Sequence, residues 1–485
     1  MNIQRRSLLL GGLAGLAPSW TRAEAPAETH PVTQVRVALS TRLGHFTDDF
    51  DAMLHRRLIR VLVPYSRTFF FQDKGQIYGT AAETTRALEE WANKTFKLGS
   101  RPLTVASIPT SRDRLFDLLA GEGDIAGGDI TITEERQKLV AFTTPFLQGV
   151  KEIIVTSADK PDLPNAEALS GMTVAVRKST SFYESLLKLN TDLAAAGKPE
   201  VSLSLVPDTL ESEDMMEMVA VGLLPAIVVD NWIAEIWVQI VKGLKLHPNA
   251  VLRQGADIAW AVRPDNPQLL AMLNKAIAEV GHNATTISNR AKVYLLKIKQ
   301  LHAATQGADM QRFRTTLGFF ERYAGEFGFD TLLLLSQGYQ ESRLDQNAHS
   351  RVGAIGLMQL MPATGSSLGV GDIHKAEANV HAGAKYMARL LDEHFKDSHF
   401  SDQNRSLFAF AAYNAGPAKI RRLQQEAAAE GLNPNLWFDN VERVAAAKVG
   451  QEPVRYVRNI YKYYVAYKLI EDAEAAKRAA QPAPG

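Results

Sequence analysis

The sequence predicts a multidomain protein in which an N-terminal α/β domain with two lobes precedes a C-terminal all-α domain. Between about residues 35 and 295, short apolar runs alternate with helical stretches, which is typical of a sheet covered by helices. These runs form two successive series, which indicates two lobes with a cleft between them. After about residue 300 the segments become helical and alanine-rich, without an alternating strand pattern.

Length and composition limit the class of protein. A chain of 485 residues is too long for one core, so two domains and a leader are expected. Its 54 basic and 53 acidic residues almost cancel, whereas a nucleic-acid-binding protein normally carries a basic excess. The absence of cysteine excludes disulfides, thiolate metal sites, a cysteine nucleophile and an acylated lipoprotein cysteine. The sequence has no metal motif and no phosphate-binding loop, so we expect no metal and no cofactor.

Residues 1–25 have the three parts of a cleavable secretory signal. Arg5 and Arg6 charge its start, an apolar run from Leu8 to Ala17 is too short to span a bilayer, and small residues follow at Ala23 and Ala25. The arginine pair favours twin-arginine export, and the alternative is an N-terminal anchor that is never cleaved. No later window supplies about 18 unbroken apolar residues, so we expect a mature protein that is soluble or peripherally attached.

The elements of the first domain follow from its apolar runs. Strands are predicted at Ile59–Val63, Leu103–Ile108, Gly123–Ala126, Glu152–Thr156, Thr173–Val176 and Pro225–Val229, and helices at Ala82–Phe96 and Asp113–Ala120. The insert at 65–79 contains three consecutive phenylalanines, which either wall the cleft or belong to the core. The acidic cluster from Glu211 to Glu217 is expected to be a solvated face.

Three segments of this domain resemble the family 3 solute-binding proteins, which bind amino acids. They read GDIAGGDITITEER at 123–136, continuing to FTTPF at 142–146, then LSGMTVAVRKSTS at 169–181 and AIVVD at 226–230. The resemblance covers most of residues 58–280 and implies a periplasmic-binding-protein-like fold.

The same resemblance implies a ligand site. Thr131 and Arg136 would grip a ligand α-carboxylate, because a guanidinium donates two parallel hydrogen bonds. Ser179 and Thr180 would add hydrogen bonds from the second lobe, and Asp230 would pair with the ligand ammonium. Two alternatives stay open: the charged residues make only structural ion pairs, or the domain is a docking or spacing module without a ligand.

The second domain, at about 300–475, is predicted to be a set of helices followed by a disordered tail at 476–485. One helix begins after Asp330, a plausible N-cap, and extends to about Leu344. Three more are predicted at Ala376–Phe395, Ser406–Asn414 and Val454–Ile470.

Five ordered motifs in this domain resemble the catalytic core of the soluble-lytic-transglycosylase family, which has a lysozyme-like fold. They read QESRL at 340–344, AHS at 348–350, GAIGLMQLMPAT at 353–364, AYNAG at 412–416 and EPVRYV at 452–457. The resemblance implies that Glu341 is the catalytic acid and then the base. It also implies that five residues bind substrate: Ser350, Gln359, Met361, Tyr413 and Asn414.

The residue types suit cleavage of a β-1,4 glycosidic bond, which needs a proton for the leaving oxygen. Glu341 follows the apolar run Leu332 to Leu335, so burial can keep its carboxyl protonated near neutral pH. No acidic residue lies between Asp345 and Asp372, so the motif loop offers no second carboxylate. This fits the resemblance to the transglycosylases, which implies that the O6 hydroxyl of N-acetylmuramic acid attacks C1 and gives a 1,6-anhydro product. The alternatives are a water-using hydrolase and a protein that binds glycan without cutting it.

The order of the two domains resembles the membrane-bound lytic murein transglycosylase F type. This resemblance implies that peptidoglycan glycan strands are the substrate and that the protein is periplasmic, peripheral to the outer membrane. It leads us to expect a muropeptide or amino acid as the ligand of the first domain, which would serve regulation or targeting.

Overall fold

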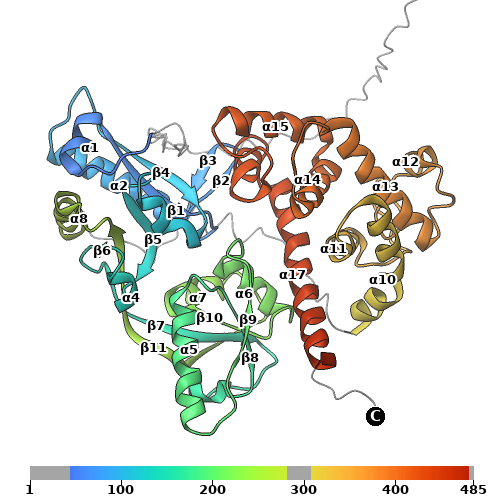
Figure 1. The fold of residues 1–485 in the computed structure, drawn as a ribbon, viewed down its shortest axis with the longest axis horizontal. Coiled ribbons are helices and arrows are strands. Elements are labelled where there is room, and N and C mark those ends of the chain that lie inside the picture. The colour runs from blue at the N-terminus through green and yellow to red at the C-terminus, as the bar shows by residue number, and fades with distance from the viewer. Residues whose placement is uncertain (1–43, 281–306, 480–485) are drawn as a thin grey trace, which may run out of the picture. The chain divides into compact units, whose positions relative to one another are not determined.

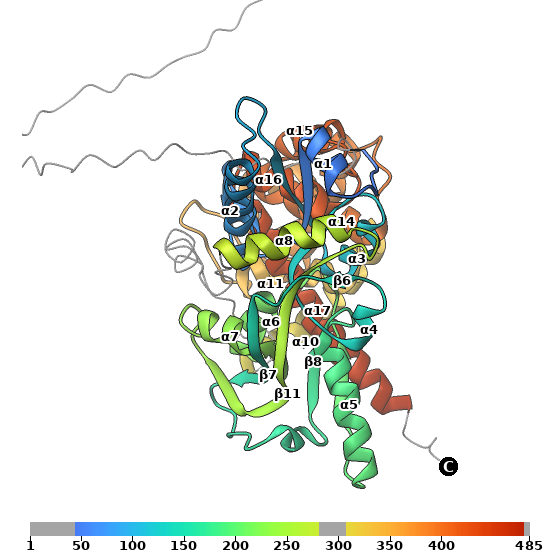
Figure 2. The same ribbon diagram turned by 90° about the vertical axis from the view of Figure 1, so that its left-hand side faces the viewer.

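The computed structural model describes residues 44–280 and 307–479. The predicted signal at 1–25 lies outside these ranges, as do the join between the two predicted domains at 281–306 and the last residues of the predicted tail. Figures 1 and 2 show the mixed α/β part of the chain followed by a part built from helices.

The first lobe is built on parallel strands. β1 (Leu58–Pro64) pairs with β4 (Thr104–Thr110) along its whole length, from Leu58 opposite Thr104 to Pro64 opposite Thr110, and also with β5 (Ile125–Thr131). Parallel neighbours need crossover connections, which α2 (Thr80–Thr95) and α3 (Leu115–Leu119) supply. Smaller elements complete the lobe: α1 (Phe50–Arg56), β2 (Phe71–Asp73), β3 (Gln76–Tyr78), α4 (Glu134–Gln137), β6 (Ala141–Phe142) and α8 (Pro267–Val280).

The second lobe combines both strand directions. β7 (Leu147–Ser157) is antiparallel to β10 (Ala226–Asp230), which is parallel to β8 (Thr173–Val176), and β9 (Ser202–Leu205) pairs with β8. Its helices are α5 (Ser181–Ala195), α6 (Ser212–Ala220) and α7 (Asn231–Trp237). α5 buries Phe182, Leu186, Leu189 and Leu193, and this spacing of four, three and four residues places them on one helix face.

One long strand joins the lobes. β11 (Leu244–Val262) pairs antiparallel with β5 of the first lobe and with β7 of the second, so the strand order is β4-β1-β5-β11-β7-β10-β8-β9. The predicted two-lobed α/β domain is therefore confirmed.

The second part of the chain is helical, as predicted. Its helices are α10 (Gly307–Phe327), α11 (Thr331–Ser342), α12 (Pro362–Leu368), α13 (Ala376–His394), α14 (Asp402–Ala415), α15 (Pro417–Ala429), α16 (Glu442–Lys448) and α17 (Gln451–Ala479). Within residues 307–479 the structure has only isolated β-bridges, at His349–Ile355 and Ile355–Leu360. Helix α17 extends to Ala479, so residues 476–479 are helical where a tail was predicted.

Helix α11 begins as the sequence indicated. The Asp330 carboxylate accepts a hydrogen bond from the Leu333 N–H at 2.8 Å, which satisfies one of the free donors at the helix start. The helix ends at Ser342, because Arg343 adopts a left-handed conformation with φ 57°. In Figure 1, α11 lies between α17 and α10, and both helices contact it. Within residues 44–280 and 307–479, no helix is long and apolar enough to cross a membrane.

The acidic cluster on α6 is not a solvated face, contrary to the prediction. Glu213 is 1% exposed, Asp214 3% and Glu217 5%. The ion-pair partners of Asp214 and Glu217 are Arg67, Arg458 and Lys462, which are distant in sequence. A local charge pattern does not reveal such partners, and for this reason the sequence predicted a solvated face.

Candidate active site

Glu341 lies in the last turn of α11. Leu332 to Leu335 and Gln337 on the same helix are buried. Gly338 faces α10 closely, since a Cβ there would lie 2.7 Å from the Phe320 ring. A helix C-terminus carries partial negative charge, which disfavours a carboxylate. Glu341 itself is partly buried, so its position and its burial both favour the protonated form.

The pKa of Glu341 is raised from 4.5 to about 7, and burial is the cause. The Tyr456 hydroxyl, from α17, donates a hydrogen bond to Glu341 Oε1 and opposes this rise. Gln337 Nε2 donates in turn to the Tyr456 hydroxyl at 3.3 Å. A carboxyl with a pKa near 7 can both give and take a proton at neutral pH.

Sequence reasoning assigned no role to Tyr456. The only available signal was its place in the EPVRYV motif at 452–457. Nothing in that motif shows that α17 packs against α11, so the contact with Glu341 was not predictable from spacing.

The loop that follows α11 is fixed by buried hydrogen bonds. The Ser342 hydroxyl donates to Leu357 O at 2.9 Å. Asn379, on α13, accepts from the Met358 N–H at 2.8 Å and donates to Ile355 O at 3.0 Å. Gly356 has φ 78°, and a Cβ there would lie 2.5 Å from Asn379 Nδ2. Glycine is therefore required at 356.

Three of the predicted substrate-binding residues belong to this loop. The Ser350 hydroxyl accepts a hydrogen bond from the Ala354 N–H at 2.9 Å. Gln359 Nε2 donates to Ala348 O at 3.1 Å and to Gly356 O at 3.0 Å. These hydrogen bonds stabilise the conformation of the loop. The third residue, Met361, is the N-cap of α12, and its side chain is 43% exposed.

Tyr413 and Asn414 lie near the end of α14. The Tyr413 hydroxyl donates to Met358 O at 2.7 Å, so it holds the same loop. Burial raises the pKa of Tyr413, and the charge of Glu341 adds to the rise, which places the phenol within its electrostatic reach. Asn414 is exposed. The direct hydrogen bond to Glu341 thus comes from Tyr456, which is not one of the predicted site residues.

The first domain contains a cavity of about 30 Å³ between its lobes. Thr131, Arg136, Thr180 and Asp230 line it, so the structure brings together four of the five predicted ligand residues. Ser179 does not line the cavity, and its hydroxyl donates to Asp208. Phe69, from the aromatic insert, also lines the cavity, whereas Phe70 and Phe71 are buried in the core.

Arg136 bridges the two lobes. It donates to Thr131 O of the first lobe at 3.0 Å and to Ser179 O of the second lobe at 3.2 Å. The Ser181 hydroxyl also donates to Thr131 Oγ1 across the cleft, at 3.3 Å. A cavity of about 30 Å³ has room for little more than water. An amino acid would enter only if the lobes separated.

Two further arginines line this cavity, and the sequence analysis did not single them out. Arg177 is ion-paired with Glu211 at 2.9 Å, and Arg112 donates to Gly128 O at 3.0 Å. No cluster of three or more acidic or histidine side chains that could hold a metal ion occurs within the described residues.

Comparison with known proteins gives two family matches. Residues 59–292 match the model of the bacterial extracellular solute-binding proteins, family 3, and residues 319–435 match that of the transglycosylase SLT domain. A solved ancestral arginine-binding protein, bound to arginine, is 26% identical with a TM-score of 0.39, covering 47% of this chain and 95% of that chain. The two family matches define the class, which is a solute-binding-like domain joined to a lysozyme-like transglycosylase domain.

Two relatives match over both domains. A membrane-bound lytic murein transglycosylase F of Desulfosudis oleivorans is 30% identical over 374 residues, covering 73% of this chain and 79% of the relative. One of Ectopseudomonas mendocina is 26% identical over 429 residues, covering 84% of this chain and 83% of the relative. The chain belongs to the membrane-bound lytic murein transglycosylase F family, and it is a peptidoglycan lytic transglycosylase.

Proposed function

We propose that the protein cleaves the β-1,4 bond between N-acetylmuramic acid and N-acetylglucosamine without water, with Glu341 as the only acid and base. The observation that carries this proposal is the environment of Glu341. Burial raises the pKa of Glu341 to about 7, and the hydrogen bond from Tyr456 opposes this rise. Among the described residues, no second carboxylate contributes to the shift, whereas a two-carboxylate hydrolase needs a partner about 5–9 Å away.

The reaction follows from one group with two protonation states. Protonated Glu341 gives its proton to the glycosidic oxygen as the bond to C1 breaks, and the alcohol leaves. The resulting carboxylate then takes the proton of the muramic acid O6 hydroxyl, whose oxygen forms the new bond to C1. Glu341 ends protonated, and the product is a 1,6-anhydro sugar. The internal hydroxyl is effective because no second molecule has to be captured.

The remaining predicted residues would act around Glu341. In this proposal Met361 contacts a sugar face, Asn414 hydrogen-bonds the N-acetyl group, and Ser350, Gln359 and Tyr413 shape the loop beneath the sugar. Their support is the location of Ser350 and Gln359 on one loop and the bond from Tyr413 to Met358 O.

Cleavage in water enriched in heavy oxygen separates this reaction from hydrolysis. A hydrolase places the water oxygen at C1 of the product, whereas the proposed reaction incorporates none. We expect mass spectrometry of the released muropeptides to show unlabelled anhydro ends. Labelled reducing ends, formed by the enzyme itself, would establish the hydrolase instead.

For the first domain we propose a ligand with an α-carboxylate and an ammonium group, either an amino acid or the peptide stem of a muropeptide, that regulates or targets the enzyme. Arg136 and Asp230 line one cavity and suit these two groups. Burial lowers the pKa of Arg136, as expected of a desolvated cation that an anion would stabilise. The alternative is a spacing domain without a ligand.

Thermal unfolding with free amino acids and with peptide stems tests this ligand. A ligand at about 100 times its Kd should stabilise the domain by about 2.7 kcal/mol. The expected result is a higher melting temperature that Arg136→Gln abolishes, while Arg389→Gln, at an exposed pair on α13, leaves it intact. Unchanged melting and no calorimetric signal across all these compounds would support the spacing domain.

We also propose that the protein acts in the periplasm, peripherally attached to the outer membrane. The support is the signal-like pattern of residues 1–25 and the name of the relatives, which are membrane-bound lytic murein transglycosylases. Cell fractionation should recover the processed chain with the envelope and release it with salt. Recovery of an unprocessed chain in the cytoplasm would contradict this location.

A further inference from the structure

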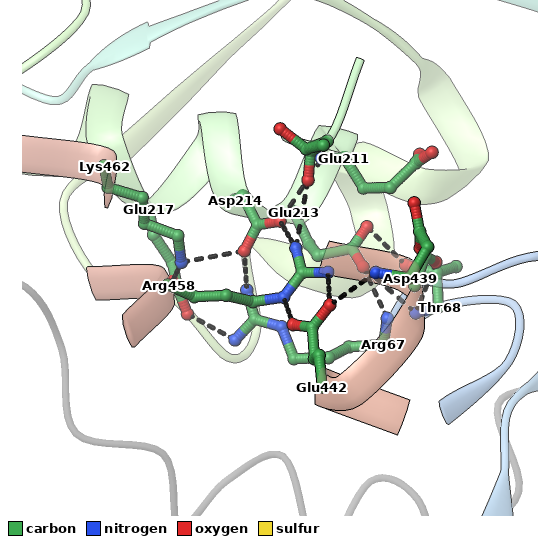
Figure 3. A network of polar contacts seen from close by, with 12 residues as sticks. Arg67, Thr68, Glu211, Glu213, Asp214, Glu217, Asp439, Glu442, Arg458 and Lys462 are labelled. Atoms are coloured by element: carbon green, nitrogen blue, oxygen red, sulfur yellow. Dashed lines mark hydrogen bonds and ion pairs between the residues drawn. The ribbon is translucent and has the colours of Figure 1, made fainter. Parts of the chain in front are cut away.

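The buried carboxylates of α6 bind cations from α17. Lys462 Nζ lies 2.7 Å from both an Asp214 oxygen and a Glu217 oxygen, and Arg458 Nη1 lies 3.4 Å from Asp214 (Figure 3). Helix α6 lies within the part of the chain that matches the solute-binding proteins, at 59–292. Helix α17 packs against α11 and α14, which lie within the match to the transglycosylase domain at 319–435, so we count it with that domain. These ion pairs therefore connect the two domains directly.

The network also includes the first lobe and the segment before α17. Arg67, which follows β1, lies 2.7 Å from Glu217 and 3.1 Å from Asp214. Arg458 is ion-paired with Glu442 at the start of α16, and its Nη1 donates to Thr209 O at 3.0 Å. Figure 3 shows the charged side chains of this network converging from separate segments of the chain.

The charges in the network are matched. Burial alone would raise the pKa of Asp214 and Glu217, but Lys462, Arg67 and, at Asp214, Arg458 lower both below their ordinary values. Burial raises the pKa of the neighbouring Glu213, and the charge of Asp214 adds to the rise. Glu213 accepts hydrogen bonds from the Arg67 N–H and the Thr68 hydroxyl. Three carboxylates, from Asp214, Glu217 and Glu442, thus face three cations.

Such a network is weak evidence for stability, because apolar side chains of similar volume often stabilise a fold as well. Its directional contacts instead specify one arrangement of the helices that carry the charges. Arg458 and Lys462 are four residues apart, so they lie on one face of α17 and fix both its rotation and its position along its axis.

Tyr456 lies on the same helix, two positions before Arg458. Its hydroxyl donates to the Glu341 carboxylate, so a displacement of α17 changes the hydrogen bond at the reacting group. A misplacement of about 1 Å at a catalytic site can cost about a hundredfold in rate.

We propose that Arg458 and Lys462 are positioning residues for the transglycosylase reaction, and that Asp214 and Glu217 of the solute-binding-like domain hold them so that Tyr456 meets Glu341. This inference rests on the proposed role of Glu341. It assigns the first domain a contribution to the catalytic centre that does not depend on any ligand in its cleft.

The test measures kcat, KM and the pH dependence of the full chain on purified glycan strands. Asp214→Asn, an isosteric change in the other domain, should lower kcat about tenfold with KM unchanged. It should also move the alkaline limb of the profile to higher pH, since the Tyr456 hydrogen bond lowers the pKa of Glu341. Tyr456→Phe should give the same shift.

A double-mutant cycle shows whether the two effects share one path. The Asp214→Asn, Tyr456→Phe double variant should be no slower than Tyr456→Phe alone. Glu217→Gln repeats the test if Asp214→Asn fails to fold. Lys468→Met is the matched control, because it removes a cation of α17 whose partners are exposed, and it should keep the wild-type profile.

The outcomes separate this inference from the proposed function. If Glu341→Gln abolishes activity but Asp214→Asn and Glu217→Gln fold and keep the wild-type pH profile, the positioning role is wrong. Additive losses in the double-mutant cycle would overturn it as well. If Glu341→Gln retains full activity, the proposed catalytic role itself fails.

Discussion

At the residue scale, the behaviour of Glu341 follows from its burial at the end of α11. Its pKa is about 7 in the folded protein and 4.5 as the ordinary value. A raised pKa means that the protonated form is favoured by the fold. Stability from this group is present in full below pH 4.5 and is lost as the pH rises through about 7.

Glu341→Gln should therefore change the pH dependence of stability. Relative to this variant, the wild type should lose up to about 3 kcal/mol of unfolding free energy between pH 4.5 and 7.5, because the ionised carboxylate is poorly solvated. Denaturant unfolding across this pH range measures the difference. Glu393→Gln, at an exposed pair, serves as the control. A constant difference between Glu341→Gln and wild type at all pH values would show that Glu341 has no raised pKa.

The site residues that were predicted from the sequence lie in recognisable motifs, whereas those that were missed act through contacts with residues elsewhere in the sequence. Glu341 was found because a long ordered motif surrounds it, and its apolar run indicated burial. Tyr456 and Asn379 act through hydrogen bonds to residues far away in the sequence, at Glu341 and Met358. Their partners depend on how α11, α13 and α17 pack, which periodicity does not specify.

At the scale of elements, the loop between α11 and α12 determines how the acid is presented. Gly353 and Gly356 both have positive φ, at 90° and 78°. A side chain at 356 would collide with Asn379, whereas a Cβ at 353 meets nothing within 4 Å. The two glycines therefore form a matched pair.

Gly353→Ala should cost about 1–2 kcal/mol, the backbone penalty alone. Gly356→Ala should lower the free energy of unfolding by this amount and by about 1–3 kcal/mol more, because the Asn379 side chain must move. It should also reduce activity, since Asn379 holds the loop under Ser350 and Gln359. Chemical denaturation and cleavage assays measure both. Equal losses for the two variants would mean that Asn379 does not constrain the loop.

Most elements were predictable from local pattern, and the deviations have physical causes. Strand β8 coincides with its prediction at Thr173–Val176, and α11 begins at the predicted cap. Helix α14 begins at Asp402, earlier than predicted, because the Ser401 hydroxyl caps it by accepting from the Asn404 N–H. The buried acidic face of α6 was misread because its cations lie on segments distant in sequence.

At the scale of the whole molecule, backbone and side-chain contacts join the two domains beyond the ion network. The Lys74 N–H donates to Ala446 O at 2.9 Å, and the Gln451 N–H donates to Asp73 Oδ1 at 2.9 Å. Arg443, which is buried, donates to Pro109 O at the end of β4 at 3.0 Å. We expect such contacts to couple the unfolding of one domain to that of the other.

Arg443→Met should weaken this coupling. Loss of a buried charge-assisted hydrogen bond lowers the free energy of unfolding by about 1.5–3 kcal/mol. This substitution removes a contact between the two domains and leaves the core of each domain intact. Scanning calorimetry should show two separated transitions where the wild type shows one. Arg389→Met, at an exposed pair on α13, should melt like the wild type. A single unshifted transition for Arg443→Met would show that the domains are coupled without it.

The measurement that most directly tests the central claim is the digestion of purified sacculi by the full chain and by Glu341→Gln, with mass spectrometry of the released muropeptides. Removal of a general acid costs about a hundredfold to ten-thousandfold in rate. We expect the wild type to release 1,6-anhydro muropeptides and Glu341→Gln to release them more slowly by about a hundredfold or more. Release of anhydro products by Glu341→Gln at the wild-type rate would contradict the claim that Glu341 performs the cleavage.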